Sequence, residues 1–144
     1  MLYEAAFWRP DVPRPPLEVA LSDSRLARYL ADWGRHGDMA LVAEGSGTEP
    51  LGAAWYRLLH STEPGYGYVS AAVPEITIAV LVEYRRLGYG SALLAALVEE
   101  ARQSGFDALS LSVEPDNPAV RLYSRLGFEP VGHAVDALTM IRRL

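Results

Sequence analysis

A glycine-containing loop between a predicted strand and a predicted helix decides how this chain is interpreted, and its sequence is Arg85-Arg86-Leu87-Gly88-Tyr89-Gly90-Ser91. The residues before it, 75–82, are rich in β-branched side chains and predict a buried strand. The residues after it, 91–104, carry leucine, valine and alanine at helical spacing. The first N–H groups of a helix lack intrahelical partners and lie at the positive end of its dipole. The loop therefore predicts an anion site large enough for a pyrophosphate, with a tight turn that binds nothing as the alternative.

Outward from this loop, the sequence alternates between predicted strands and helices. Besides 75–82, we expect strands over residues 2–8, 39–44, 51–59, 109–113 and 137–144. We expect two short helices within 17–34 and longer ones over 91–104 and 117–127. Four prolines between residues 10 and 16 predict a stiff connector. The expected order is β–α–α–β–β–β–α–β–α–β, a mixed α/β domain.

Length and composition indicate one folded domain. The chain has 144 residues, which fits a single domain spanning 1–144. Half of the residues are hydrophobic and 22% are charged, a balance typical of globular proteins. The longest apolar run, 92–98, is far too short to span a membrane. The chain begins without a basic region ahead of an apolar core, so we expect no secretory signal and a cytoplasmic location.

Two residue types are absent, and their absence excludes several functions. Without cysteine the chain has no disulfide, thiolate nucleophile or thiolate metal site. Without lysine it has neither a Walker A phosphate loop nor a Schiff-base lysine, so arginine or backbone N–H groups must bind any phosphate. The 13 arginines form no basic tract and face 18 acidic residues, for a net charge of −5. Nucleic acids and membranes are therefore not expected partners.

The glycine spacing of the loop distinguishes between two cofactor classes. Two other Gly-x-Gly pieces, at 45–47 and 65–67, do not join a strand to a helix and are interpreted as turns. A dinucleotide-binding loop needs a third glycine, but residue 93 is leucine, which excludes a nicotinamide cofactor. The loop does resemble the Arg/Gln-x-x-Gly-x-Gly/Ala motif of the GCN5-related N-acetyltransferases, although its lead-in has valine where the family commonly has proline.

A second motif, in the order that the family has it, supports the resemblance. After the predicted strand 109–113, the matching residues are Asn117, Ala119, Tyr123, Gly127 and Phe128. The resemblance is clear from Glu75 to about Gly132 and looser over the rest of the chain. It implies a single-domain α/β fold with a central, twisted, mostly antiparallel mixed sheet and helices on both faces. It also implies that the fourth and fifth expected strands, 75–82 and 109–113, splay apart.

The resemblance implies acetyl-CoA as the cofactor. The pyrophosphate would lie on the loop, and a backbone N–H near Val80 would meet the thioester carbonyl while neighbouring groups pair with the pantetheine arm. The residues expected to contact the cofactor are Val80, Leu81, Val82, Arg85, Arg86, Leu87, Gly88, Tyr89, Gly90, Ser91, Asn117, Ala119 and Tyr123. Asn117 is equally explained as the N-cap of the helix that follows it.

Tyr123 is implied as the general acid of the transfer. A phenol with a reference pKa of about 10 keeps its proton at neutral pH and can donate it to a departing thiolate. By spacing alone, Tyr123 would be interpreted as an aromatic core residue of its helix. The family motif favours the catalytic role.

Glu75 is the candidate general base, because it lies where some members of the family keep a base glutamate. It could remove the proton of the acceptor amine directly or through water. The alternative is a glutamate that faces solvent at the start of a strand. Glu83, near the loop, is a poorer candidate. His36, His60 and His133 are isolated and lack ligand spacing, so we expect no metal site.

The acceptor is expected to bind to the first two helices and to the loop before residue 75, because such segments vary most within a fold. Four aromatic residues there are candidate acceptor contacts: Tyr29, Trp33, Trp55 and Tyr56. Tyr66 and Tyr68 lie in the same region. These rings could contact an amine through cation–π interactions, and part of the set is equally explained as ordinary core.

The function expected from these features is an N-acetyltransferase that moves an acetyl group from acetyl-CoA to an amine by direct transfer in a ternary complex. The acceptor is a small molecule or a peptide, and a homodimer formed through the last strand is an expected possibility. The alternative is a catalytically inactive acyl-CoA-binding sensor or interaction module. A third interpretation is a globular domain whose loop binds nothing.

Overall fold

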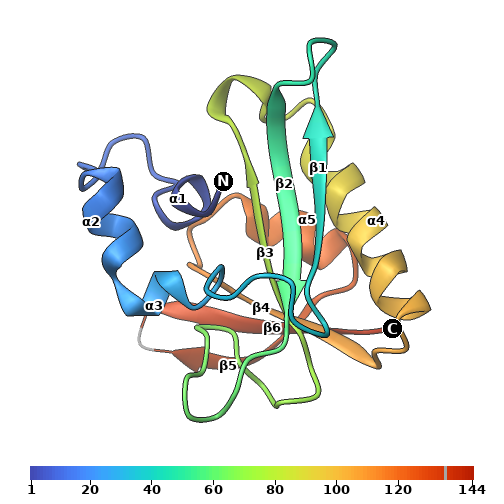
Figure 1. The fold of residues 1–144 in the computed structure, drawn as a ribbon. Helices are drawn as coiled ribbons and strands as arrows, with labels where there is room; N and C mark the ends of the chain where they lie inside the picture. The colour runs from blue at the N-terminus through green and yellow to red at the C-terminus, as the bar shows by residue number, and fades with distance from the viewer. Residues whose placement is uncertain (135) are drawn as a thin grey trace.

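The computed structural model describes residues 1–134 and 136–144. The strands in this part of the chain are β1 (Met39–Glu44), β2 (Pro50–Arg57), β3 (Glu75–Val80), β4 (Ala108–Val113), β5 (Glu129–Ala134) and β6 (Ala137–Arg143). The helices are α1 (Leu2–Ala6), α2 (Leu17–Ser22), α3 (Ser24–Ala27), α4 (Tyr89–Gln103) and α5 (Ala119–Arg125), with a 3-10 turn, η1 (Val82–Tyr84). The chain is thus a mixed α/β structure, as predicted (Figure 1).

The strands form one sheet in the order β1-β2-β3-β4-β6-β5. Every neighbouring pair is antiparallel except β3 and β4, which run parallel. These two strands pair at one position, Glu75 opposite Ser110, whereas β2 and β3 pair along six positions from Gly52 to Arg57. The predicted splay between the fourth and fifth expected strands is therefore confirmed at β3 and β4.

Alternation along the strands gives the sheet two faces with separate cores. The core on the α4 face includes Ala54, Tyr56, Ile76, Leu94 and Leu97. The core on the opposite face consists of Leu2, Tyr29, Ala53, Trp55 and Leu59, which brings α1 and the segment after α3 onto that face. Figure 1 shows α4 and the α1–α3 group on opposite sides of the molecule.

The prediction of a strand over residues 2–8 is wrong, because residues 2–6 form α1. Tyr3 and Phe7 lie one helical turn apart with ring centroids 5.0 Å from each other, and Leu2 is buried. A run this short fits strand and helix spacing equally well, so tertiary packing decides. The sheet gains β5 instead, an edge strand whose register shifts between Pro130 and Gly132.

Two further predictions need correction. The last strand, β6, lies between β4 and β5, so it has no free edge for pairing with a second copy of the chain. The second helix within 17–34 ends at Ala27. Its continuation is held by the fully buried Arg57 of β2, whose Nη1 donates to the carbonyl oxygens of Arg28 (2.7 Å) and Ala31 (2.9 Å). This anchoring sets Tyr29 against the sheet.

Candidate active site

The divergence of β3 from β4 leaves main-chain groups of β3 facing a gap. The N–H of Leu81 donates to the carbonyl oxygen of Leu51 at 2.9 Å. This bond continues the antiparallel pairing of β3 with β2. The carbonyl of Pro74 points the other way and accepts from Ser110 N at 3.0 Å. Because main-chain groups alternate along a strand, the N–H groups of Ile78 and Val80 also point toward β4. Both residues lie beyond the one position at which β3 pairs with β4, Glu75 opposite Ser110.

The loop between η1 and α4 presents a run of free N–H groups. Within the described residues, none of the N–H groups of 86–91 donates to a backbone or side-chain acceptor, and the first helical bond runs from Ala92 to Gly88. Arg86 and Gly88 both have positive φ, 63° and 95°. Such alternation curves successive N–H groups toward one point and forms an anion-binding concavity. The anion site predicted from the sequence therefore has the required backbone geometry.

Arg85 differs in part from its expected role. Its Nε donates to the carbonyl of Val80 at 2.9 Å, and its Nη1 donates to the carbonyl of Trp8 at 3.2 Å. Arg9, which follows Trp8 in the chain, forms ion pairs with Glu114 and Asp116 beyond the end of β4, at 2.6 and 2.7 Å. Residues 8 and 9 therefore link the ends of β3 and β4, and Arg85 holds the end of β3 in place.

A surface cavity of about 560 Å³ adjoins this link. It is lined by Arg9, Glu114, Pro115, Asp116 and Asp136. The side chain of Arg9 is about one-third exposed, so solvent screens its ion pairs and they add little to stability. Among the described residues, the lining of the cavity is thus mainly acidic, with Arg9 as its one basic residue.

Tyr123 of α5 is buried in the core on the α4 face. Its ring packs edge-on against Phe128 at 6.0 Å, in the same core as Val80 and Leu122. Burial raises the pKa of its hydroxyl well above the usual value, so the group stays protonated over the physiological pH range. Within the described residues the hydroxyl makes no hydrogen bond. Tyr123 is therefore both a core residue, as its spacing predicts, and a phenol with a proton available.

Asn117 acts locally in this structure. Its Oδ1 accepts from Ala119 N at 2.9 Å, and its carbonyl accepts from Val120 N at 3.0 Å. Both contacts satisfy N–H groups at the start of α5, which is the capping role that the sequence also predicts. Ala119 is half-buried against the core on the α4 face.

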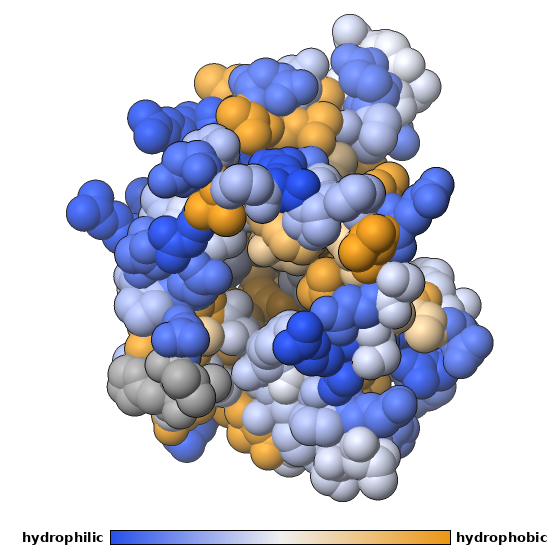
Figure 2. All heavy atoms as spheres, turned by 90° about the vertical axis from the view of Figure 1, so that its left-hand side faces the viewer, coloured by the Kyte–Doolittle hydropathy of each residue, from blue (hydrophilic) through white to orange (hydrophobic). Residues whose placement is uncertain are grey.

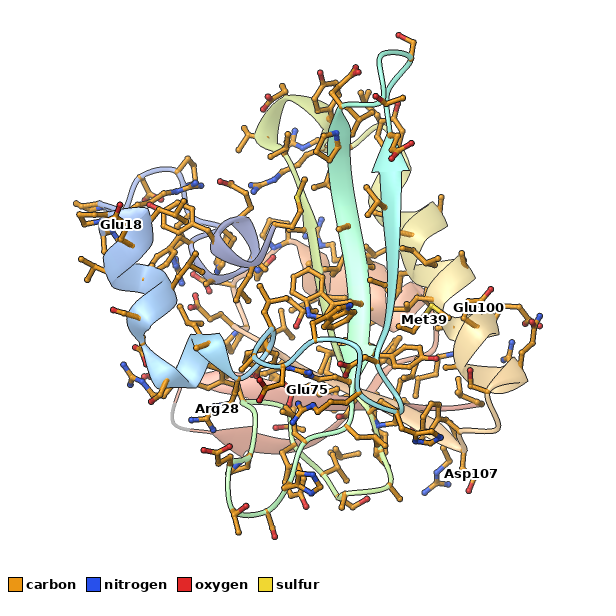
Figure 3. The ribbon with its side chains drawn as sticks, in the orientation of Figure 1. Glu18, Arg28, Met39, Glu75, Glu100 and Asp107 are labelled. Carbon is orange, nitrogen blue, oxygen red and sulfur yellow. The ribbon has the colours of Figure 1, made fainter. Side chains whose placement is uncertain are left out.

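Glu75 is buried at the start of β3, with 3% of its surface exposed, so the prediction of a solvent-facing glutamate is excluded. Figure 3 shows it in the middle of the molecule. Its Oε1 accepts from Tyr29 Oη at 2.6 Å and from Gly67 N at 2.8 Å. Its Oε2 has no hydrogen-bond partner and lies against Gly65, where a Cβ would overlap it.

The surroundings of Glu75 favour its protonated form. Burial raises the pKa of the carboxyl group above the ordinary value, while the hydrogen bonds from Tyr29 and Gly67 and the charge of Arg28 lower it in part. Arg57, the cross-strand neighbour of Glu75, is paired with Asp38 at 2.8 Å. Glu75 is therefore a desolvated carboxyl group without an ion pair of its own, which is typical of functional sites.

The six aromatic residues that were expected around the acceptor divide into separate sets. Tyr29 and Trp55 lie in the core on the Glu75 face, with Tyr68 packed against them. Tyr66 stacks on Tyr29 at 6.4 Å. Trp33 is 43% exposed and lies 5.4 Å from the Arg57 guanidinium. The expectation for Tyr56 is wrong, because it is buried on the α4 face with its hydroxyl 3.3 Å from Ser104.

The glycines at 65 and 67 were predicted to form only a turn, but they shape the surroundings of Glu75. A Cβ at Gly67 would overlap the backbone of β4 at Leu111 and Ser112. The loop therefore packs directly on the backbone of β4, and its Gly67 N–H reaches the carboxylate of Glu75 on β3. In the sequence, the Gly-x-Gly piece at 65–67 was the feature that could have indicated a close approach of this loop to the backbone of β4.

Residues 1–134 and 136–144 show neither a metal site nor a membrane-spanning helix. No cluster of metal-ligating side chains occurs in this part of the chain, and the side chain of His133 lies outside the described residues. None of the described helices combines the length and apolar character that a membrane span requires. Figure 2 shows that the side of the molecule carrying α1–α3 is hollowed between polar side chains, with a more apolar floor.

Solved structures share this fold. A ribosomal-protein-alanine N-acetyltransferase from Brucella melitensis is 27% identical, with a TM-score of 0.70 over 99% of this chain and 89% of that one. A Salmonella typhimurium protein solved with its cofactor acetyl-CoA is 29% identical, with a TM-score of 0.64 over 85% of this chain and 73% of that one.

Sequence comparisons agree with the structural ones. The mycothiol acetyltransferase of Corynebacterium aurimucosum is 32% identical over 132 residues, which are 87% of this chain and 40% of that protein. The ribosomal protein bS18 alanine N-acetyltransferase of Haemophilus influenzae is 33% identical over 70 residues, 46% of this chain and 48% of that protein. The matches span less than half of both relatives. The model of the acetyltransferase (GNAT) family matches residues 4–128, and the chain therefore belongs to that family.

Proposed function

We propose that this chain transfers an acetyl group from acetyl-CoA to an amine by direct transfer in a ternary complex, and that residues 1–144 act as one N-acetyltransferase domain. The observation that carries the proposal is two sets of main-chain N–H groups, those of Ile78 and Val80 beyond the paired part of β3 and the free ones of residues 86–91 at the start of α4. The first pair suits an acyl-pantetheine arm, and the second group suits a pyrophosphate.

The glycines of the loop support an approaching ligand. A Cβ at Gly90 would meet Leu122 and Val80 at 3.5 and 3.8 Å, which are ordinary contact distances. Packing therefore leaves room for alanine at this position, although glycine in a helix costs up to about 1 kcal/mol relative to alanine. Close approach of a phosphate to the backbone explains the glycine. Acetyl-CoA, when bound, supplies an activated acetyl group as a thioester.

The acceptor side of the reaction needs a base, and Glu75 fills that role. Residues 75, 77 and 79 of β3 face away from α4, so Glu75 and Thr77 lie on one side of the gap. Five residues of strand separate Glu75 from Val80, about 17 Å at roughly 3.3 Å per residue. Glu75 therefore accepts the proton through intervening hydroxyl groups or water rather than at the thioester itself.

Tyr123 supplies the acid. Its hydroxyl remains protonated because of its burial, and it lies in the core that Val80 enters from the other side of the gap. Donation of its proton to the departing sulfur stabilises the leaving group as a thiol. The acid and the base thus belong to opposite faces of the sheet.

The acceptor is an amine of a small molecule or of a protein. Relatives are named for both classes, mycothiol acetyltransferase and ribosomal-protein-alanine N-acetyltransferase. The acidic cavity at Glu114, Asp116 and Asp136 would attract a cationic amine toward the open end of the gap. The relatives' names argue against the alternative of an inactive acyl-CoA-binding module.

Two measurements test this function. Calorimetric titration of acetyl-CoA, with ATP as the control for general phosphate binding, is expected to give micromolar binding of acetyl-CoA only. Thiol release from acetyl-CoA is then followed with a panel of small amines and peptides with free N-termini. Binding without release for any amine would favour the inactive module, and absence of binding would refute both functions.

A further inference from the structure

The hydroxyl group of Tyr29 joins the segment after α3 to the loop before β3 and to the carboxylate of Glu75 on β3. The N–H of Tyr66 donates to Tyr29 Oη at 2.8 Å. Because the oxygen already accepts this hydrogen bond, the hydroxyl proton of Tyr29 is available for Glu75 Oε1, 2.6 Å away. The segment after α3, the loop before β3 and β3 itself therefore meet at one oxygen atom.

The two oxygens of the carboxylate are not equivalent. Oε1 accepts from both Tyr29 Oη and Gly67 N, whereas the buried Oε2 has no partner. Hydrogen bonds to Oε1 stabilise the charged carboxylate and hold the plane of the group. A proton arriving at this group would therefore be bound at Oε2.

We propose that Tyr29 is a positioning residue of the acetyl transfer, which fixes Glu75 so that Oε2 is the atom that takes the proton of the acceptor amine. The inference rests on the proposed function. Tyr29 then contacts neither acetyl-CoA nor the acceptor. The positioning role replaces the acceptor contact expected from the sequence.

The step balances as follows. The amine nitrogen uses its lone pair to form the C–N bond, and its proton passes through intervening hydroxyl groups or water to Oε2 of Glu75. The C–S bond breaks, and the sulfur takes the proton of Tyr123. Glu75 then releases its proton from Oε2 to solvent, and Tyr123 takes up a proton from solvent.

Several charged or titratable groups surround Glu75 and contribute to its pH dependence. Arg28, at the end of α3, lowers its pKa, and the side chain of Arg28 also bonds to the carbonyl of Pro64 in the loop. Arg57 of β2 is neutralised by Asp38. The rings of Tyr29 and Tyr66 stack beside the carboxylate. Neither Arg28 nor Arg57 bonds to Glu75 among the described residues.

The test compares Tyr29→Phe with Tyr56→Phe, which removes a hydroxyl from an equally buried tyrosine on the opposite face. Loss of the hydrogen bond to Oε1 raises the pKa of Glu75, so the acidic limb of the kcat/KM profile is expected to move to higher pH. The high-pH plateau should stay within roughly tenfold of that of the parent protein, since the base is still present. Tyr56→Phe should leave the limb in place.

Further variants separate the possible failures. If Glu75→Gln is inactive and the limb of Tyr29→Phe does not move, the role of Tyr29 is refuted and the proposed function stands. If Glu75→Gln is fully active, Glu75 is not the base. Should Tyr29→Phe fail to fold, Gly65→Ala is the second variant, because its Cβ would collide with Oε2 of Glu75 and with the side chain of Leu59 while the Tyr29 hydroxyl is kept. Its kcat should fall while its KM for acetyl-CoA is kept, and an unchanged kcat would refute the role of Oε2.

Discussion

The two ends of β3 carry the two halves of the site and are built in opposite ways. At the C-terminal end, Val80 leads into a loop whose free N–H groups come from consecutive residues, 86–91. At the N-terminal end, Glu75 is surrounded by groups from distant segments, including Tyr29, 46 residues earlier in the chain. The first end is open and unsatisfied, whereas the second is buried and satisfied except at Oε2.

This difference separates binding from chemistry. An exposed row of N–H groups can hold an anion without reorganisation, which suits the donor. A desolvated carboxyl group with one free oxygen suits proton transfer, because its pKa is raised toward neutral pH. Changes at the two ends of β3 should therefore affect different kinetic quantities.

The largest effect on acetyl-CoA binding is expected for Gly88→Val. The φ of 95° is unfavourable for valine, and its side chain would occupy the concavity. Loss of two charge-assisted hydrogen bonds, each worth about 1.5–3 kcal/mol, would weaken acetyl-CoA binding more than about 100-fold. Calorimetry measures this change.

Gly105→Val is the matched control, because Gly105 follows the other end of α4 with a φ of 80° and no atom within 4 Å of a Cβ. It should lose similar stability and keep its affinity for acetyl-CoA. Equal loss of affinity in both variants would mean that strain, and not the concavity, explains the result.

Glu75→Gln changes the other end of β3. The amide oxygen can still accept from Tyr29 and Gly67, but no group remains to take the proton. We expect kcat to fall roughly 100- to 10,000-fold, the usual contribution of a general base, with an unchanged Kd for acetyl-CoA. A parallel change in Kd would show that the two ends are not independent.

Tyr123→Phe should have a smaller effect on turnover. A thiol with a reference pKa of about 8.5 leaves more easily than most groups, so we expect kcat to fall roughly 10- to 100-fold. The affinity for acetyl-CoA should change little. Full activity in this variant would remove the assignment of Tyr123 as the acid, and Tyr56→Phe controls for the loss of a buried hydroxyl.

The smallest effect concerns stability. Because the pKa of Glu75 is raised in the folded state, the unfolded state loses this proton first as pH rises. The contribution of Glu75 to the free energy of unfolding therefore falls between its unfolded and folded pKa values. The difference in Tm, Glu75→Gln minus parent protein, should be more positive at pH 8 than at pH 4. A Tm difference independent of pH would contradict the raised pKa.

The same comparison explains what the sequence could predict. The loop at 85–91, helix α4 and the hairpin of β1 and β2 depend on local spacing, and all three are present where they were expected. Residues 2–8 were misassigned as a strand and the strand at 129–134 was not predicted, because their states are set by contacts with the core and by pairing with β6.

The surroundings of Glu75 could not be predicted either. Which tyrosine reaches its carboxylate depends on where α3 ends, and this is decided by the buried Arg57. The role of Gly67 depends on how closely the loop packs on the backbone of β4. Sequence patterns locate single elements, whereas these contacts require the elements to be assembled.

The most direct test of the central claim is an acetyl-CoA titration followed through the backbone amide NMR signals. The account predicts that the amides of residues 86–91 shift most, together with those of Ile78 and Val80 in the gap. The amides of the β1–β2 turn at Gly45 and Gly47 should remain in place. Saturable binding that leaves 86–91 unchanged, or no binding at all, would contradict the account.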